Sequence, residues 1–357
     1  YLYTGAGLKI DKCYLMCIDN TYVRDGEIEP DKLFQKIDVT DEIRNTYSKT
    51  VEDNVTEMVK AISSETFIEI GIGAHCSDPY PCPLTEKCWS FLPERNVFLL
   101  YINKKLPLSL IKEGVLELTA IPEKYELNEK NQIQVDCEKT GKPHIDQNKI
   151  KGFLDTIQYP AYYMDFETCA SVIPLFDGSS PYQQIPFQFS VHVVKEKGAK
   201  PEHFSFLADD TNDPRPEFMA KLKEVMGTKG SVIAYNVGFE IGILRKCAEW
   251  LPEYKTWVES IGKRMIDLLQ PFRDFAYYHP AQDGSCSLKK VLPALTGKSY
   301  DDMAIGDGGT ASAEYYRITF AEDNKDRDKV RKDLEEYCGL DTMGMVDIVN
   351  KLYRFTK

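Results

Sequence analysis

No stretch of this sequence is apolar for long enough to cross a bilayer, and the chain does not open with the basic and apolar segments of a secretory signal. It also lacks internal repeats and low-complexity tracts, which excludes a repeat architecture. No Gly-x-x-x-x-Gly-Lys motif occurs, which argues against a phosphatase or nucleotide hydrolase. These absences favour a cytoplasmic globular protein with no membrane partner.

A surplus of positive charge is missing as well. The net charge is −12, which argues against a protein that coats duplex nucleic acid through a broad basic face. It leaves open an enzyme whose metal ions neutralise part of the acidity and which holds a single strand locally.

The 10 cysteines are not spaced as a small secreted disulfide framework would be. Cys169, Cys247 and Cys338 lie in apolar segments and are expected to be small buried side chains in a reducing compartment.

At 357 residues the chain is long enough for more than one domain. Its first residues resemble the middle of a larger protein, so we expect the chain to be a fragment. We predict an N-terminal domain over 1–103, a helical connector over 104–158 and a second domain over 159–357. In the first domain we expect a strand at 14–18, a hairpin-like turn at 24–27, a helix over 41–63 and a Cys- and Pro-rich loop over 71–93.

The second domain has the pattern of a mixed sheet flanked by helices, an α/β fold. Three strands come first, and helices then alternate with a further strand. The expected strands are 162–166, 187–194, 203–207 and 231–235. The expected helices are 216–226, 239–250, 287–295 and 329–353.

Two carboxylates interrupt the apolar run at 160–168. Alternate residues of a strand share a face, so Asp165 and Glu167 should point the same way. Like charges on a buried strand are costly unless a cation lies between them, and a divalent metal ion is the common remedy. The pattern alone is weak, because Asp136 and Glu138 repeat it in polar surroundings.

Two other segments carry acidic residues where burial would not predict them. The sequence Tyr-Asn-Val-Gly-Phe-Glu at 235–240 joins a strand to a helix and places Glu240 near the helix N-terminus. In the last helix, Tyr337 and Asp341 are four residues apart and share a face. Each motif also has a structural explanation: a solvated strand edge, a helix cap, or a surface hydrogen bond. Their order and their expected elements favour a metal site.

The three motifs together resemble those of the DnaQ-like 3′–5′ exonucleases with a ribonuclease H-like fold, in the tyrosine-containing (DEDDy) subclass. That resemblance covers about residues 158–355. It implies an Asp-x-Glu on the first strand, an Asn-x-x-Phe-Asp at a strand-to-helix junction, and a Tyr-x-x-x-Asp on the last helix. The matching residues are Asp165 and Glu167, then Asn236, Phe239 and Glu240, then Tyr337 and Asp341. One departure is Glu240, where the family has Asp.

The resemblance implies two-metal phosphodiester hydrolysis. Two Mg²⁺ or Mn²⁺ ions about 4 Å apart activate water and hold the leaving oxygen, and carboxylates are the ligands that such ions prefer. Four carboxylates would bind the metal, and Tyr337 would orient or deprotonate the water. Asn236 and Phe239 would contact the strand or brace the motif. The expected metal ligands are Asp165, Glu167, Glu240 and Asp341.

The segment 174–188 follows the first motif and is rich in turn formers and aromatic residues. It is expected to cover the cleft, with Phe176 or Tyr182 stacking on bases and Gln183 and Gln184 donating hydrogen bonds. A packed connecting loop is the equal alternative. Lys289 and Lys290, on the 287–295 helix, are expected to face solvent, the alternative being that they grip phosphates.

Three evenly spaced cysteines, Cys76, Cys82 and Cys88, lie in the proline-rich loop, with His75 beside the first. Three thiolates so held bind zinc, with His75 as fourth ligand, or three corners of an iron–sulfur cluster. The loop is similar to the cysteine cluster of RecB-like, PD-(D/E)XK nucleases, which implies a [4Fe–4S] cluster in the full-length protein. Only the C-terminal part of such an α/β domain would be present here. The fragment itself is compatible with an incomplete cluster, zinc, free thiols or an adventitious disulfide.

We therefore expect a divalent-metal-dependent exonuclease that degrades single-stranded DNA or RNA from the 3′ end. As a whole the chain resembles a bacterial family that joins a RecB-like nuclease domain to a DnaQ-like one. The alternative is an inactive ribonuclease H-like module that binds nucleic acid or a protein partner. Oligomeric state and cellular pathway are left open.

Overall fold

The computed structural model describes residues 1–47, 50–64, 66, 70–103, 105–321 and 325–357, and the chain divides into two compact units. The N-terminal unit comprises Tyr1–Trp89 with Ser171–Gln183. The sheet unit comprises Ser90–Ala170 with Gln184–Lys357. This division differs from the predicted domain boundaries, because residues 90–158 belong to the same unit as the sheet.

The N-terminal unit contains a two-stranded antiparallel ribbon. Strands β1 (Tyr14–Ile18) and β2 (Phe34–Asp38) pair with Tyr14 opposite Asp38, which confirms the strand predicted at 14–18.

The single helix predicted over 41–63 is wrong, since α3 (Thr40–Asn45) ends before α4 (Val51–Ile62) begins. Residues 45–47 are weak helix formers, and the acidic first turn of α4 favours a new start. Positions 48–49 of that prediction lie outside the described residues. The other helices are α1 (Leu2–Gly5), α2 (Pro30–Leu33), η2 (Ala74–Cys76) and α5 (Thr85–Cys88).

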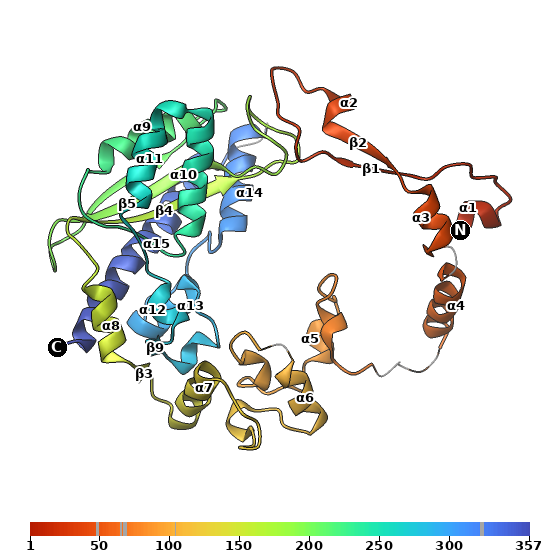
Figure 1. Cartoon of the computed structure of the whole chain (residues 1–357), viewed down its shortest axis with the longest axis horizontal. Coiled ribbons are helices and arrows are strands. Elements are labelled where there is room, and N and C mark those ends of the chain that lie inside the picture. Colours follow the sequence, from red (N-terminus) through yellow and green to blue (C-terminus); the bar gives the residue numbers. More distant parts are fainter. Residues whose placement is uncertain (48–49, 65, 67–69, 104, 322–324) are drawn as a thin grey trace. The chain divides into compact units, whose positions relative to one another are not determined.

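A five-stranded mixed sheet organises the other unit (Figure 1). Its strands are β4 (Ala161–Cys169), β5 (Ile185–Val194), β6 (Glu202–Leu207), β7 (Val232–Ala234) and β8 (Met265–Asp267), in the order β6-β5-β4-β7-β8. Antiparallel pairs join β4 to β5 and β5 to β6, whereas β4, β7 and β8 run parallel. The α/β class and the four predicted strands are confirmed; β8 was not predicted.

Helices cover both faces of this sheet (Figure 1). On one face Tyr162, Met164 and Phe166 join a core with residues of α9 (Arg215–Val225), α10 (Gly238–Trp250) and α11 (Lys255–Gly262). Burying such a side chain contributes about 1.5–3 kcal/mol. Both α15 (Arg327–Phe355) and α14 (Gly308–Phe320) contact β4, and α13 (Leu288–Thr296) packs on α15. The opposite face of β4 therefore meets the last helix.

Residues 90–158, which include the connector predicted over 104–158, form more than a connection. Val97, Leu110, Leu118 and Val135 form a core of their own. Arg95 joins Glu138 and Asp283, and it donates a hydrogen bond of 2.7 Å to the carbonyl of Pro280. The elements here are η3 (Val97–Leu99), α6 (Leu106–Lys112), η4 (Leu118–Ala120), α7 (Glu129–Thr140), β3 (His144–Ile145) and α8 (Gln147–Leu154).

The remaining short elements lie in the connections between the longer helices and strands of this unit. Strand β9 (Tyr277–Tyr278) pairs antiparallel with β3. The others are η5 (Pro252–Tyr254), α12 (Gln270–Arg273) and η6 (Pro280–Gln282). None of the helices in the described part of the chain combines the length and the apolar character needed to span a bilayer.

Candidate metal centre

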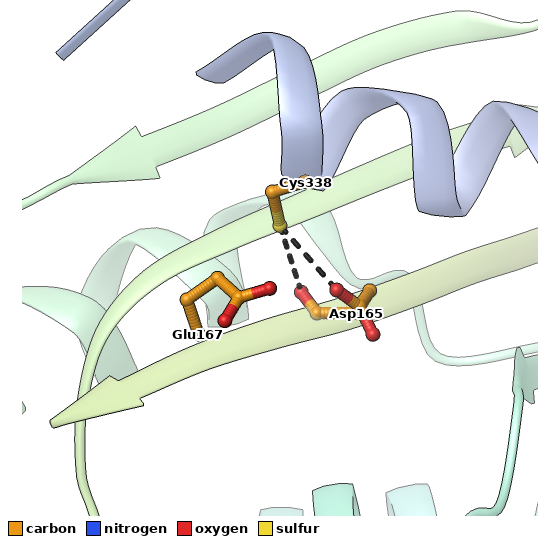
Figure 2. Close-up of side chains that lie close together, drawn as sticks. All are labelled: Asp165, Glu167 and Cys338. Atoms are coloured by element: carbon orange, nitrogen blue, oxygen red, sulfur yellow. Dashed lines mark hydrogen bonds between the residues drawn. The ribbon is translucent and has the colours of Figure 1, made fainter. Parts of the chain in front are cut away.

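Strand β4 presents its two carboxylates to the last helix. Tyr162, Met164 and Phe166 enter the core on one face, so the alternation of the strand turns Asp165 and Glu167 to the other face. Figure 2 shows both side chains beside Cys338 of α15. Glu167 is buried, whereas Asp165 keeps partial exposure. The predicted shared face of the two carboxylates is confirmed.

Helix α15 adds three side chains to this face of β4. Tyr337, Cys338 and Asp341 are all buried. The Cys338 thiol donates to Asp165 Oδ2 at 3.5 Å, and possible ligand atoms of Asp165, Glu167 and Cys338 all lie within 4.8 Å of one another. The sequence predicted Cys338 only as a small buried side chain. Its place directly after Tyr337 was the available sign of a role at the site.

Hydrogen bonds between side chains of β5 and groups of α15 hold the last helix on the sheet. The Gln188 amide donates to the carbonyl of Leu334 at 2.9 Å, and the hydroxyls of Ser190 and Thr342 are 2.6 Å apart. Both contacts are buried, where the net stabilisation by a hydrogen bond is about 1 kcal/mol and an unmade bond costs more. This anchoring holds the register in which Asp341 faces β4.

The carboxyls of the site repel one another when charged, and the described side chains around them carry too little positive charge for all of them to ionise together. Burial raises the pKa of Asp165 well above its usual range, and the charges of three other carboxylates raise it further. Burial, followed by the charge of Asp341, raises the pKa of Glu167 to about 8. Burial also raises the pKa of Asp341 to about 6, although a hydrogen bond from the Tyr300 hydroxyl opposes this shift. A divalent cation would remove the repulsion and restore the charged forms.

Glu240 brings the third segment to the site. It lies in the first turn of α10, is only 2% exposed, and its charge is among those that raise the pKa of Asp165. Among the described residues, none forms a hydrogen bond with Glu240 Oε2. Burial, followed by the charge of Asp267, raises the pKa of Glu240 to about 8. A buried, unpartnered carboxylate oxygen is a group that a metal ion would satisfy.

The parallel strands explain why these segments converge. Tyr163 of β4 pairs with Ile233 of β7, so Asp165 lies level with the carboxyl end of β7, where α10 begins. Asp267 ends the neighbouring strand β8, and its Oδ1 accepts the backbone N–H of Asn236 at 2.9 Å. Functional side chains gather at the carboxyl ends of parallel strands in α/β proteins.

Two residues near the carboxylates, Tyr300 and Asp267, were not predicted from the sequence, and a third, Lys289, was predicted to face solvent. The Tyr300 hydroxyl donates to Asp341 Oδ1 at 2.5 Å, and Asp267 approaches Glu240. Lys289, expected to face solvent, donates to the carbonyl of Gly306 at 2.5 Å and lowers the pKa of both Glu167 and Asp341. Tyr300 lies in a polar turn without a recognisable motif. Asp267 would have been noticed had the short strand β8 been predicted.

A pocket of about 430 Å³ adjoins Glu167. Phe239, 40% exposed, lines it with Thr168, Gln184 and Gly308. Asn236 is exposed at the start of α10, with a backbone φ of +74°. Phe239 thus lines a pocket beside the carboxylates, and its contact with a substrate stays a prediction.

The other predicted substrate residues belong to the N-terminal unit. Phe176 is buried, so its ring does not offer a face for a base, and the stacking role predicted for it is wrong. Tyr182 is 56% exposed, and Gln183 Oε1 accepts the backbone N–H of Ser180 at 3.0 Å. In the sheet unit the wall of the pocket includes Gln184 instead. The substrate contacts of Tyr182 and Gln183 stay predictions.

The cysteine loop forms a separate pocket of about 530 Å³ in the N-terminal unit. His75, Cys76, Cys82 and Cys88 all line it, and the thiols are free rather than disulfide-bonded. In the described residues no three of their ligand atoms lie within 4.8 Å of one another. As placed they fit neither a closed tetrahedral zinc site nor a cluster. The iron–sulfur or zinc site stays a prediction.

Comparisons with known proteins find similarity over part of the chain. A family model described as "Domain of unknown function (DUF2779)" matches residues 162–287, which include Asp165, Glu167 and Glu240. A Mycoplasma pneumoniae protein described as "Uncharacterized protein MG366 homolog" is 25% identical over 221 residues, 56% of this chain and 33% of that protein. "Uncharacterized protein MG366" of Mycoplasma genitalium is 27% identical over 222 residues, 57% of this chain and 33% of that protein.

The chain thus spans about one third of the length of the curated relatives it matches. No solved structure matches it.

Proposed function

We propose that the sheet unit is a divalent-metal-dependent 3′–5′ exonuclease of the ribonuclease H-like, DnaQ-like kind, acting on single-stranded DNA or RNA. Support for the fold comes from the sheet. Numbered along the chain from β4 to β8, its strands lie in the order 3-2-1-4-5, with strand 2 antiparallel to its neighbours. A mixed sheet with helices on both faces is the fold that the resemblance to ribonuclease H-like exonucleases implies.

The observation that carries the proposal is the pair of Asp165 and Glu167 carboxyls, whose possible ligand atoms lie within 4.8 Å of each other and of Cys338, with the charges of Asp341 and Glu240 near enough to raise the pKa of Asp165. Asp165 and Glu167 come from β4, Glu240 from α10 and Asp341 from α15. An unpartnered oxygen of Glu240 and the raised pKa values of all four carboxyls fit a site for Mg²⁺ or Mn²⁺. When bound, such ions would activate water and stabilise the phosphate charge.

The side chains around the carboxylates have distinct roles in this proposal. Burial, with the charges of Asp341 and Glu167, raises the pKa of Tyr337, so its phenol stays neutral and can orient a water molecule by hydrogen bonding. The Tyr300 hydroxyl holds Asp341 in one orientation. Phe239 would stack on the terminal base in the pocket beside Glu167, where one base contact contributes about 1–3 kcal/mol.

Glu240 decides how well this site can work. It is one methylene longer than the aspartate of the resembled family, and it lies in the first turn of α10. The side chain keeps the charge, and Asp267 lies close enough to influence it. We propose that Glu240 is a metal ligand with altered reach rather than a lost ligand.

The test uses 5′-labelled single-stranded DNA and RNA with the full chain and Mg²⁺ or Mn²⁺. We expect products that shorten progressively from the 3′ end, and no shortening when the 3′ end is blocked. Asp165→Asn and Asp341→Asn should each lower the rate by at least about 100-fold, the scale for loss of a group that stabilises the transition state. Asp136→Asn is the matched control, because Asp136 opens the other Asp-x-Glu and is exposed.

Two results would contradict the proposal. If the wild type is inert with both metals yet binds the strand as well as Asp165→Asn does, the unit is a binding module, the alternative that the sequence left open. If it hydrolyses nucleotides but not polymers, it belongs to the phosphatase class.

A further inference from the structure

Two adjacent lysines on α13 lie in different surroundings, although the sequence treats them alike. Lys290 is exposed and pairs with Asp283 at 2.6 Å. Lys289 is half-buried, and its Nζ donates to the carbonyl of Gly306 at 2.5 Å. The same Nζ lies 5.5 Å from the ring centroid of Tyr337. Lys289 thus belongs to the wall of the metal centre and Lys290 does not.

The position of Gly306 connects Lys289 to the pocket. Gly308, two residues later, begins α14 and lines the pocket together with Glu167. A Cβ added at Gly308 would lie 3.5 Å from Glu167 Oε2. The ammonium of Lys289 is therefore held between the Tyr337 side of the carboxylates and the pocket beside Glu167.

The ammonium group of Lys289 forms no salt bridge with the described residues. Within the described part of the chain, no carboxylate oxygen lies within 4.0 Å of its Nζ, while an ammonium has three N–H donors and Gly306 accepts one. Lys289 acts through space on Glu167, Asp341 and Asp307, lowering the pKa of each. One such cation is too little to neutralise four carboxyls, so a role as their counter-ion does not account for it.

Once divalent ions occupy the carboxylates, a fixed ammonium beside them repels those ions and has to be stabilised by an anion. A phosphate group in the site is such an anion, and lysine binds phosphate as a compact point charge. We propose that Lys289 contacts the phosphate group of the strand that is being cleaved and stabilises the negative charge that develops on it. This inference rests on the proposed exonuclease function.

The experiment compares Lys289→Gln, Lys289→Arg and Lys290→Gln in the full chain. For Lys289→Gln we expect kcat on a single-stranded oligonucleotide to fall about 100-fold, with Lys289→Arg restoring most of it. Mn²⁺ affinity without substrate, measured by calorimetry, should at the same time rise about threefold to tenfold, because a nearby repelling charge is gone. Lys290→Gln should match the wild type in both measurements.

A purely structural role predicts the opposite pairing, because a disordered wall would weaken Mn²⁺ binding and turnover together. That result, or an unchanged kcat in Lys289→Gln, would overturn the inference and leave the exonuclease proposal standing. A second probe is independent of turnover: a nucleoside 5′-monophosphate with Mn²⁺ should bind the wild type and lose affinity in Lys289→Gln. If the wild type is inert but this loss is seen, the exonuclease proposal fails and the phosphate contact of Lys289 stands. An unchanged affinity for the monophosphate would refute the contact.

Discussion

The buried carboxyls make the stability of the sheet unit depend on pH and on Mg²⁺ together. Glu167 and Glu240 have pKa values of about 8 in the fold, against an ordinary value of 4.5. A group whose pKa is raised by folding binds its proton more tightly in the folded state. Its contribution to stability is complete below pH 4.5 and is lost as the pH rises to 8. The metal-free protein should therefore become less stable across this window.

The size of the effect follows from the same values. One pH unit corresponds to about 1.4 kcal/mol for a fully shifted group, so Glu240 alone, at 2% exposure, loses at most about 5 kcal/mol between pH 4.5 and 8. Entry of water as the site relaxes lowers this figure, and we expect about 2–3 kcal/mol. For a unit of this size each kcal/mol shifts Tm by about 2–4 °C. The metal-free Tm should fall by about 5–10 °C.

Mg²⁺ should reverse this loss, and more strongly at pH 8 than at pH 5.5, because its ligands must be deprotonated. At 100 times its dissociation constant a ligand stabilises by about 2.7 kcal/mol, so the Tm at pH 8 should rise by about 5–10 °C. The measurement is a circular dichroism melt with EDTA or Mg²⁺ at both pH values. Mg²⁺ is the suitable ion because thiolates such as those of the cysteine loop bind it poorly.

Asp165→Asn provides the control for that experiment. It removes one ionisable carboxyl from the cluster, so it should be at least as stable as the metal-free wild type at pH 8 and gain little from Mg²⁺. The reasoning is refuted if the metal-free Tm rises with pH through this window. It is also refuted if Mg²⁺ stabilises Asp165→Asn as much as the wild type.

Two further predictions follow from contacts outside the motifs. Tyr300→Phe removes the hydrogen bond to Asp341 and should weaken Mg²⁺ binding about tenfold by calorimetry, whereas Tyr316→Phe, on an exposed ring, should not; equal affinities would contradict the positioning role. Gly230→Ala should destabilise the protein by more than about 2 kcal/mol in urea unfolding, because φ is +84° and the new Cβ would lie 1.9 Å from a backbone carbonyl oxygen. The helical control Gly242→Ala meets open space and should stabilise by about 0.5–1 kcal/mol.

Local pattern was a good guide where the two faces of an element have different neighbours. The helical spacing at 329–353 predicted α15 closely, because burial of one face imposes that period on the sequence. The alternation at 187–194 predicted β5 closely although the whole strand is buried, because its apolar side chains alternate with Gln188 and Ser190, which form hydrogen bonds with α15. The helix predicted over 41–63 was wrong, since its pattern is amphipathic but the chain between α3 and α4 favours ending a helix. Strand β8, only three residues long, is too short to carry a period at all.

The sequence by itself determined the α/β class, the strand that turns Asp165 and Glu167 to one face, and the helix that pairs Tyr337 with Asp341. Each depends on a repeat of two or of about four residues, which neighbours along the chain set. Only the tertiary structure decided which side chains surround the carboxylates. Lys289 and Tyr300 reach them from separate segments, and Lys290 turns away. Such convergence depends on how helices pack on the sheet, and no local period encodes it.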